Sequence, residues 1–155
     1  MKKNRLLILL SLITMIFALS CGLNENPPYD LKYVHIMYNN ASETTVNSKA
    51  NTIGTYSVYL SSEEIKEAVV VTYEITIGSG LKENVDYKIL TKGNTLNFLP
   101  GIYDMPIRIQ WLSNPIDKSK DNTIEIKLIS TDHQDFSVGM PGPDKVQSKF
   151  KITKI

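Results

Sequence analysis

The sequence predicts an all-β protein, a single antiparallel β-sandwich of seven or eight strands behind an N-terminal segment outside the fold. From residue 31 onward, apolar side chains recur at every second position, which is the strand period. Turns containing glycine or proline separate these runs. Only residues 61–68 (SSEEIKEA) offer a helical alternative, and they make at most two turns. Short strands with one apolar face each favour two antiparallel sheets packed face to face.

The first four predicted strands lie between residues 33 and 90. Residues 33–38 and 52–60 each alternate between two sets of side chains, and the second run places a tyrosine, a valine and a leucine on one face. The clearest run is 68–77, where valine, tyrosine and isoleucine face one way and mostly threonine and glutamate the other. The glycines of residues 78–80 end it, and residues 87–90 form a short strand.

The other four predicted strands lie between residue 95 and the end of the chain. Residues 95–98 form a short strand, and 105–112 alternate clearly. Trp111 shares a face with two isoleucines in that run, so it is expected in the core. Residues 123–130 set isoleucine and leucine against glutamate and lysine, and 146–153 form the last strand.

The MPGP segment at residues 140–143 precedes the last predicted strand. Its two prolines have no backbone N–H with which to extend a sheet. We therefore expect this loop to end a strand or to protect a sheet edge.

The N-terminus is typical of a secretory signal. Three basic residues (Lys2, Lys3 and Arg5) precede the uncharged apolar block of residues 6–19. As a helix, this block would span about 21 Å, which is shorter than the roughly 30 Å hydrocarbon core of a bilayer. A permanent transmembrane helix is the less favoured interpretation. The predicted organisation is a signal peptide at 1–20, a tether at 21–30 and the sandwich at 31–155.

Cys21 is the only cysteine, and it directly follows Ala18-Leu19-Ser20. This arrangement resembles a bacterial lipobox, although the leucine stands two residues before the cysteine instead of three. The resemblance implies that a lipid on Cys21 holds the mature protein on a membrane. It predicts an outer-membrane lipoprotein that faces either the cell surface or the periplasm. The alternative for Cys21 is an ordinary buried thiol.

Composition excludes several classes of protein. The chain has 17 basic and 16 acidic residues; removing residues 1–20 leaves 14 basic against 16 acidic, a net charge of about −2. There is no basic surplus for nucleic-acid binding. A single cysteine allows neither an intrachain disulfide nor a cysteine-rich zinc site.

The order of short motifs over residues 50–130 resembles a known family. The motifs are Val85-Asp86-Tyr87, Leu96-Asn97-Phe98, Pro100-Gly101, the strands Ile107–Trp111 and Thr123–Ile129, and the polar loop between these two strands. Together they are similar to the Calx-beta domain and to the Calx-beta-like, immunoglobulin-type domains of lipoproteins from gut Bacteroidetes. The resemblance implies an immunoglobulin-like sandwich and an extracytoplasmic context.

The same resemblance implies a candidate calcium site. Family members that bind calcium use carboxylates at one end of the sandwich; here the matching positions are Asp86, Asp117 and Asp121. Two lysines interrupt the acidic loop, and Asn122 stands where a glutamate is common. Calcium takes six to eight oxygen ligands. The alternative for Asp86 is a turn residue that accepts hydrogen bonds from nearby backbone amides.

No catalytic constellation is predicted. His35 and His133 are far apart in the sequence, and there is neither a Gly-x-Ser-x-Gly elbow nor a nucleotide-binding glycine motif. The adjacent Glu63 and Glu64 are typical of a solvated turn. We therefore expect a protein that is not an enzyme and needs no cofactor, with calcium as the one alternative.

Exposed aromatic side chains are the remaining candidates for ligand binding, because sugar rings stack on aromatic faces. Tyr59 and Tyr103 are the two candidate ligand-binding residues. The predicted function is a non-catalytic, lipid-anchored extracytoplasmic module for protein or glycan contact at the bacterial envelope, as an accessory to nutrient uptake. The alternative is a calcium-dependent adhesion module of Calx-beta type.

Overall fold

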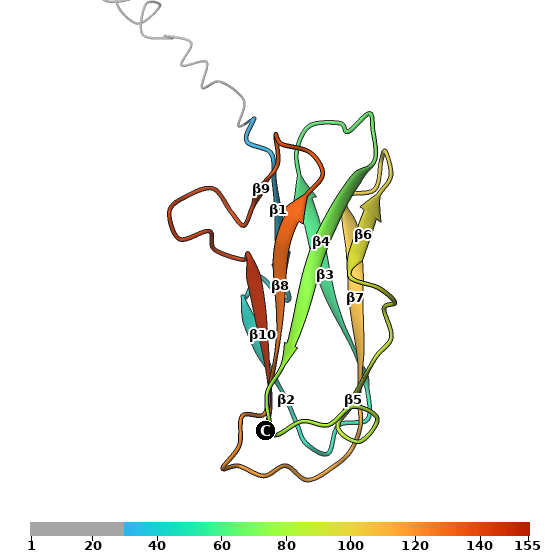
Figure 1. Ribbon diagram of the computed structural model, residues 1–155, viewed down its shortest axis with the longest axis vertical. Coiled ribbons are helices and arrows are strands. Elements are labelled where there is room, and N and C mark those ends of the chain that lie inside the picture. The colour runs from blue at the N-terminus through green and yellow to red at the C-terminus, as the bar shows by residue number, and fades with distance from the viewer. Residues whose placement is uncertain (1–29) are drawn as a thin grey trace, which may run out of the picture.

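Two five-stranded β-sheets pack face to face in the computed structural model, which describes residues 30–155 (Figure 1). The first sheet has the order β5-β7-β3-β1-β9. Its strands are β5 (Tyr87–Ile89), β7 (Asp104–Trp111), β3 (Ile53–Ser61), β1 (Tyr33–Met37) and β9 (Ser137–Val138). The second sheet has the order β2-β10-β8-β4-β6. Its strands are β2 (Glu43–Val46), β10 (Lys149–Lys154), β8 (Thr123–Thr131), β4 (Val69–Ile77) and β6 (Thr95–Phe98).

The period-two pattern decides which side chains form the core. In β4, Val69, Val71 and Tyr73 are buried while the residues between them are not. The buried residues of β8 alternate in the same way. Trp111 is only 1% exposed, which confirms its expected place in the core. The predicted all-β sandwich is therefore confirmed.

Ten strands are present among the described residues, more than the seven or eight predicted. The additional strands are β2 and β9, and each pairs in parallel at an edge, β2 with β10 and β9 with β1. All other pairs are antiparallel. β2 reads ETTV and β9 has two residues, so neither carries an apolar alternation. Residues 62–68 form a loop between β3 and β4 and contain no helix.

The loop between β9 and β10 covers the open edge of β1. The Gly139 N–H donates to the Val34 carbonyl at 2.8 Å, and the Ile36 N–H donates to the Gln147 carbonyl at 2.9 Å. Backbone groups that would otherwise be open to another strand are thereby paired. The groups that pair with β1 belong to Gly139 and Gln147, which flank the predicted segment 140–143, and residues 140–143 themselves are exposed.

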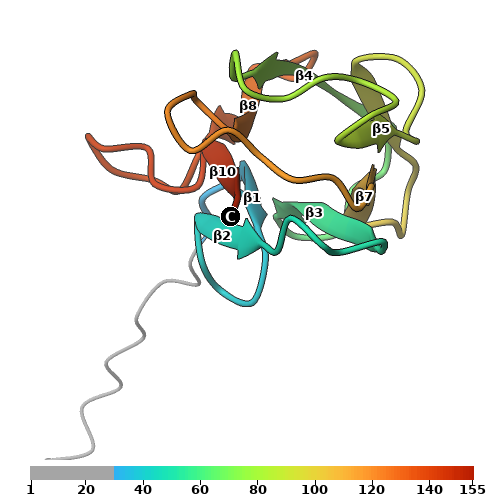
Figure 2. The ribbon, with the colours of Figure 1, turned by 90° about the horizontal axis from the view of Figure 1, so that it is seen from below.

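The described chain begins and finishes at opposite ends of the sandwich (Figure 1). The N-terminal end carries the start of the described chain and the loops 62–68, 99–103 and 132–136. The C-terminal end, viewed directly in Figure 2, carries Ile155 and the loops that precede β5 and β8. In residues 30–155, no helix is long and apolar enough to cross a membrane. The predicted signal peptide and Cys21 lie outside the described residues.

Candidate functional site

A buried ion pair joins the two sheets at the C-terminal end. Lys154, the last residue of β10, is 1% exposed, and its Nζ lies 3.0 Å from Oδ1 of Asp86. The same ammonium donates to the carbonyl oxygens of Leu112, at 2.9 Å, and of Asp86, at 3.2 Å. β10 belongs to the second sheet, whereas Asp86 precedes β5 and Leu112 follows β7 in the first sheet. The ammonium therefore links the sheets directly.

Every oxygen of the Asp86 carboxylate has a hydrogen-bond donor. Besides Lys154, Oδ1 accepts from Nδ2 of Asn114 at 2.9 Å, and Oδ2 accepts from the Lys82 N–H at 2.9 Å. Burial alone would raise the pKa of this carboxyl. The hydrogen bonds from Asn114, Lys154 and the Lys82 amide outweigh burial and hold the Asp86 pKa below its ordinary value. Asp86 is therefore a carboxylate at neutral pH.

The local chain explains how Asp86 reaches this position. The N–H of Asp86 donates to the Lys82 carbonyl at 2.8 Å, and Asn84 adopts a positive φ of 61° in the tight turn between them. Asparagine tolerates that conformation better than most residues. Tyr87, next in sequence, is buried. Asp86 is thus a turn residue that accepts from a backbone amide, as the second sequence interpretation described.

The carboxylates of the other two candidate calcium ligands each accept hydrogen bonds from the residue two positions further along the chain. Oδ1 of Asp117 accepts from the N–H and the hydroxyl of Ser119, at 3.0 and 2.6 Å. Oδ1 of Asp121 accepts from the Thr123 hydroxyl at 2.7 Å. Both aspartates are exposed, whereas Asp86 is buried.

The donor set around Asp86 does not fit a calcium ion. Calcium would have to displace an ammonium and two N–H donors from a single carboxylate, and the positive charge of Lys154 opposes it. Among residues 30–155, no group of three or more histidine, cysteine, aspartate or glutamate side chains is placed to hold a metal ion.

Tyr59 belongs to a strip of rings on the outer face of the first sheet. Its ring stacks on His35 with centroids 5.5 Å apart, and His35 lies 5.2 Å from the ring of Tyr33. We call these three residues the aromatic strip. His35 is 7% exposed, its Nδ1 has no partner among the described residues, and burial lowers its pKa. Tyr33 and Tyr59 are only half-buried, so part of each ring reaches solvent.

Tyr103 has a different environment from Tyr59. Its ring packs against the core, and its hydroxyl accepts a hydrogen bond from the Ile65 N–H at 3.2 Å. The side chain thus holds the 62–68 loop on the sandwich. The structure does not bring Tyr59 and Tyr103 onto one surface, because Tyr59 points away from the core.

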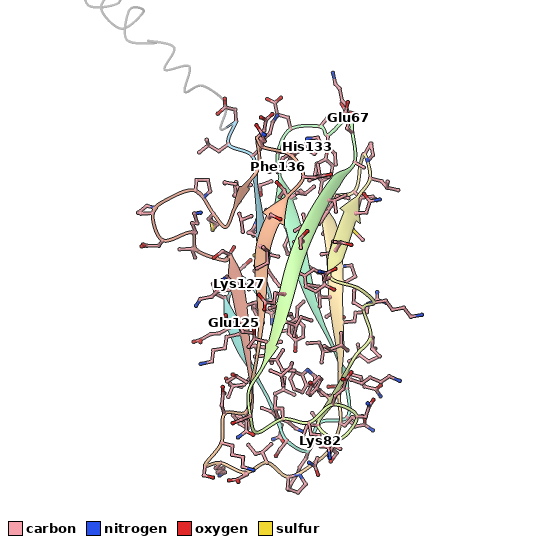
Figure 3. The ribbon with its side chains drawn as sticks, in the orientation of Figure 1. Glu67, Lys82, Glu125, Lys127, His133 and Phe136 are labelled. Atoms are coloured by element: carbon pink, nitrogen blue, oxygen red, sulfur yellow. The ribbon has the colours of Figure 1, made fainter. Side chains whose placement is uncertain are left out.

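An open cavity of about 320 Å³ lies at the N-terminal end. Its apolar lining comes from Ile65, Val69 and Phe136, and its polar lining includes Glu67 and His133. Figure 3 shows Glu67, His133 and Phe136 gathered at this end from two separate segments. No local pattern in the sequence indicates that these two segments meet. The cavity lies outside the residues predicted for a site.

These features define a β-sandwich module whose two sheets are joined by a buried ion pair. No protein-family model matches the sequence, and no curated protein is similar to it in sequence. Among solved structures, the chain is similar to CBD12 from CALX1.2, with a TM-score of 0.56 and 15% identity over 79% of this chain. It is also similar to a protein of unknown function from Bacteroides ovatus, with a TM-score of 0.55 and 11% identity over 79% of this chain.

The structural similarities establish the fold. The chain spans 43% of the length of the first structure and 46% of the second, so it matches less than half of each. At these levels of identity, the similarity concerns architecture alone. The predicted Calx-beta-like sandwich is confirmed as the fold of this chain.

Proposed function

We propose that the protein is a non-catalytic, lipid-anchored module that presents a β-sandwich outside the cytoplasm for contact with glycans or proteins of the bacterial envelope. The observation that carries the proposal is that the described chain, which starts at residue 30, begins at one end of the sandwich and finishes at the other (Figure 1). Cys21 precedes Asp30 by nine positions, which span at most about 30 Å. A lipid on Cys21 would hold the N-terminal end of the sandwich close to the membrane and its C-terminal end away from it.

The aromatic strip is the contact surface that we favour for a glycan. It lies on the outer face of a sheet, so its access does not depend on which end faces the membrane. Tyr33 and Tyr59 offer ring surface, and the buried His35 between them keeps the Tyr59 ring in a defined orientation. Rigid tyrosines contribute contact area at a low cost in conformational entropy. An accessory role in nutrient uptake follows if the bound glycan is a nutrient.

Metabolic labelling with a palmitate analogue tests the anchor. The wild-type chain should incorporate the label and fractionate with membranes, and the Cys21→Ala variant should do neither. Label that persists undiminished in Cys21→Ala would overturn the lipid anchor. Protease treatment of intact cells then distinguishes surface display from display in the periplasm.

Binding to a panel of insoluble and soluble polysaccharides tests the contact surface. Tyr59→Ala should weaken saturable binding, whereas Tyr103→Phe, which removes only the hydroxyl group bonded to Ile65, should leave it unchanged. Equal binding by the wild type and Tyr59→Ala would remove the aromatic strip as the glycan surface. Absence of binding to every polysaccharide would leave protein contact as the function to pursue.

A further inference from the structure

We propose that the ammonium of Lys154 is a built-in cation, which holds the C-terminal end of the sandwich together through the oxygens of Asp86 and Leu112. It makes the assembly of this end independent of calcium. The inference concerns Asp86 and its neighbours and does not rest on the function proposed above.

Three oxygen atoms converge on the Lys154 nitrogen. They are one carboxylate oxygen and two backbone carbonyl oxygens, at 2.9 to 3.2 Å. These are the oxygen types that calcium also takes. An ammonium has three N–H donors, and each has an acceptor here. The oxygens are thus arranged around a cation that the chain supplies itself.

The strand positions Lys154 without help from a ligand. Phe150, Ile152 and Lys154 alternate along β10 and are all buried, so the lysine occupies a core-facing position. Its backbone N–H donates to the Asn122 carbonyl at 2.9 Å, and the next N–H, of Ile155, donates to the Val46 carbonyl at 2.8 Å. Lysine is rarely buried in the core of a protein unless its charge is paired. The Asp86 carboxylate is that pair.

The ion pair joins three segments that are far apart in sequence. Asp86 lies in the loop before β5, Leu112 and Asn114 lie in the loop after β7, and Lys154 closes the last strand. A bound metal ion commonly holds loops together in this way, but an ammonium on a strand does so permanently. Calcium would have to displace hydrogen-bond donors from Asp86, because both carboxylate oxygens already accept hydrogen bonds and one of the donors is a cation.

Thermal unfolding of the full chain in detergent tests the proposal. The wild-type melting temperature should be the same, within about 1 °C, in millimolar calcium and in a chelator, because a ligand shifts stability only when it binds the folded state. A calcium-dependent rise that disappears in Asp86→Asn would overturn the proposal.

Removal of the ammonium gives the complementary test. Lys154→Met keeps most of the side-chain length but leaves the Asp86 charge buried without its partner, and the melting temperature should fall by on the order of 10 °C. Adding Asp86→Asn to Lys154→Met should recover part of that loss. A Lys154→Met variant as stable as the wild type would overturn the proposal.

Chemical rescue distinguishes a cation site from simple packing. Propylammonium should raise the melting temperature of Lys154→Ala, because it can place an ammonium among the three oxygens. Lys151→Ala is the matched control, since Lys151 is an exposed lysine in the same strand. Failure of propylammonium to stabilise Lys154→Ala beyond its effect on Lys151→Ala would count against the built-in cation. If Lys154→Ala does not fold, the proposal is still tested by the wild-type melting temperatures in calcium and in chelator, and by the Lys154→Met/Asp86→Asn double variant.

Discussion

The indole N–H of Trp111 donates a hydrogen bond to the hydroxyl of Tyr56 within the core, with nitrogen and oxygen 3.0 Å apart. The two residues lie in β7 and β3, neighbouring strands of the first sheet, and are 1% and 2% exposed. Burial raises the pKa of Tyr56 to about 12, so the phenol stays protonated throughout the physiological range. Tyr56 thus satisfies the single polar group of the only tryptophan.

Replacement of Tyr56 by phenylalanine should destabilise the protein by about 1–3 kcal/mol, because the Trp111 N–H would remain buried without an acceptor. Equilibrium unfolding in denaturant measures the loss. Tyr59→Phe serves as the control, since the Tyr59 ring is half-buried on the outer face. A Tyr56→Phe variant no less stable than this control would show that the hydrogen bond contributes little.

Gly54 makes room for the Tyr56 side chain. A Cβ on Gly54 would lie 2.5 Å from the Tyr56 hydroxyl oxygen and 2.8 Å from the adjacent ring carbon. Gly54→Ala should therefore cost about 1–3 kcal/mol of stability through overpacking. In a Tyr56→Leu background the same substitution should cost less, because the ring is gone. Strict additivity of the two substitutions would contradict the predicted overlap.

Acidification should destabilise the protein in part through His35. Burial lowers the pKa of this histidine in the folded state below its ordinary value of 6.5. As the pH falls below about 6.5, the unfolded chain takes up a proton that the folded protein does not, so stability decreases. The decrease continues until the pH reaches the folded-state pKa.

The variant His35→Phe should show a smaller loss of stability between pH 7.5 and pH 5 than the wild type. Phenylalanine keeps an aromatic ring between Tyr33 and Tyr59 without a titratable group. His133→Gln removes the other histidine, which is partly exposed, and should leave the slope of stability against pH closer to that of the wild type. An unchanged slope in His35→Phe would exclude this histidine as the cause.

Gly139 allows the loop between β9 and β10 to cover the edge of β1. It has a φ of +82°, and a Cβ there would lie 2.6 Å from the Lys145 carbonyl oxygen. Gly139→Ala should loosen the loop, expose the edge and promote self-association, which light scattering detects. The Ile36 amide, which donates to Gln147, should also exchange faster with solvent.

Gly101→Ala is the matched control for this prediction. Gly101 has a similar φ of +84°, but a Cβ there would meet no atom within 4 Å. The Gly101→Ala variant therefore shows the effect of backbone strain without a steric clash. If Gly139→Ala self-associates no more than Gly101→Ala and its Ile36 amide exchanges no faster, the loop does not protect the edge.

The predicted strands were correct wherever they carried a clear alternation. The alternation is a local property of the sequence, and it decides which face of the strand is buried. The prediction was incomplete for β2 and β9, which have no such pattern and exist through pairing with distant strands. The expected strand 146–153 begins at Lys149 in the structure, since Gln147 instead accepts from Ile36 of β1. Edge pairing depends on tertiary neighbours that a single segment does not reveal.

By itself, the sequence determined the β-sandwich and the core position of Trp111, because the strand period acts over a few neighbouring positions. Only the tertiary structure decided that Lys154 meets Asp86, 68 positions away, and that Tyr59 and Tyr103 lie on different surfaces. Both results depend on which strands become neighbours. The free energy of the buried Asp86 carboxylate depends on which charged group the fold places beside it. The resemblance that suggested calcium at Asp86 therefore could not show that the chain supplies its own cation there.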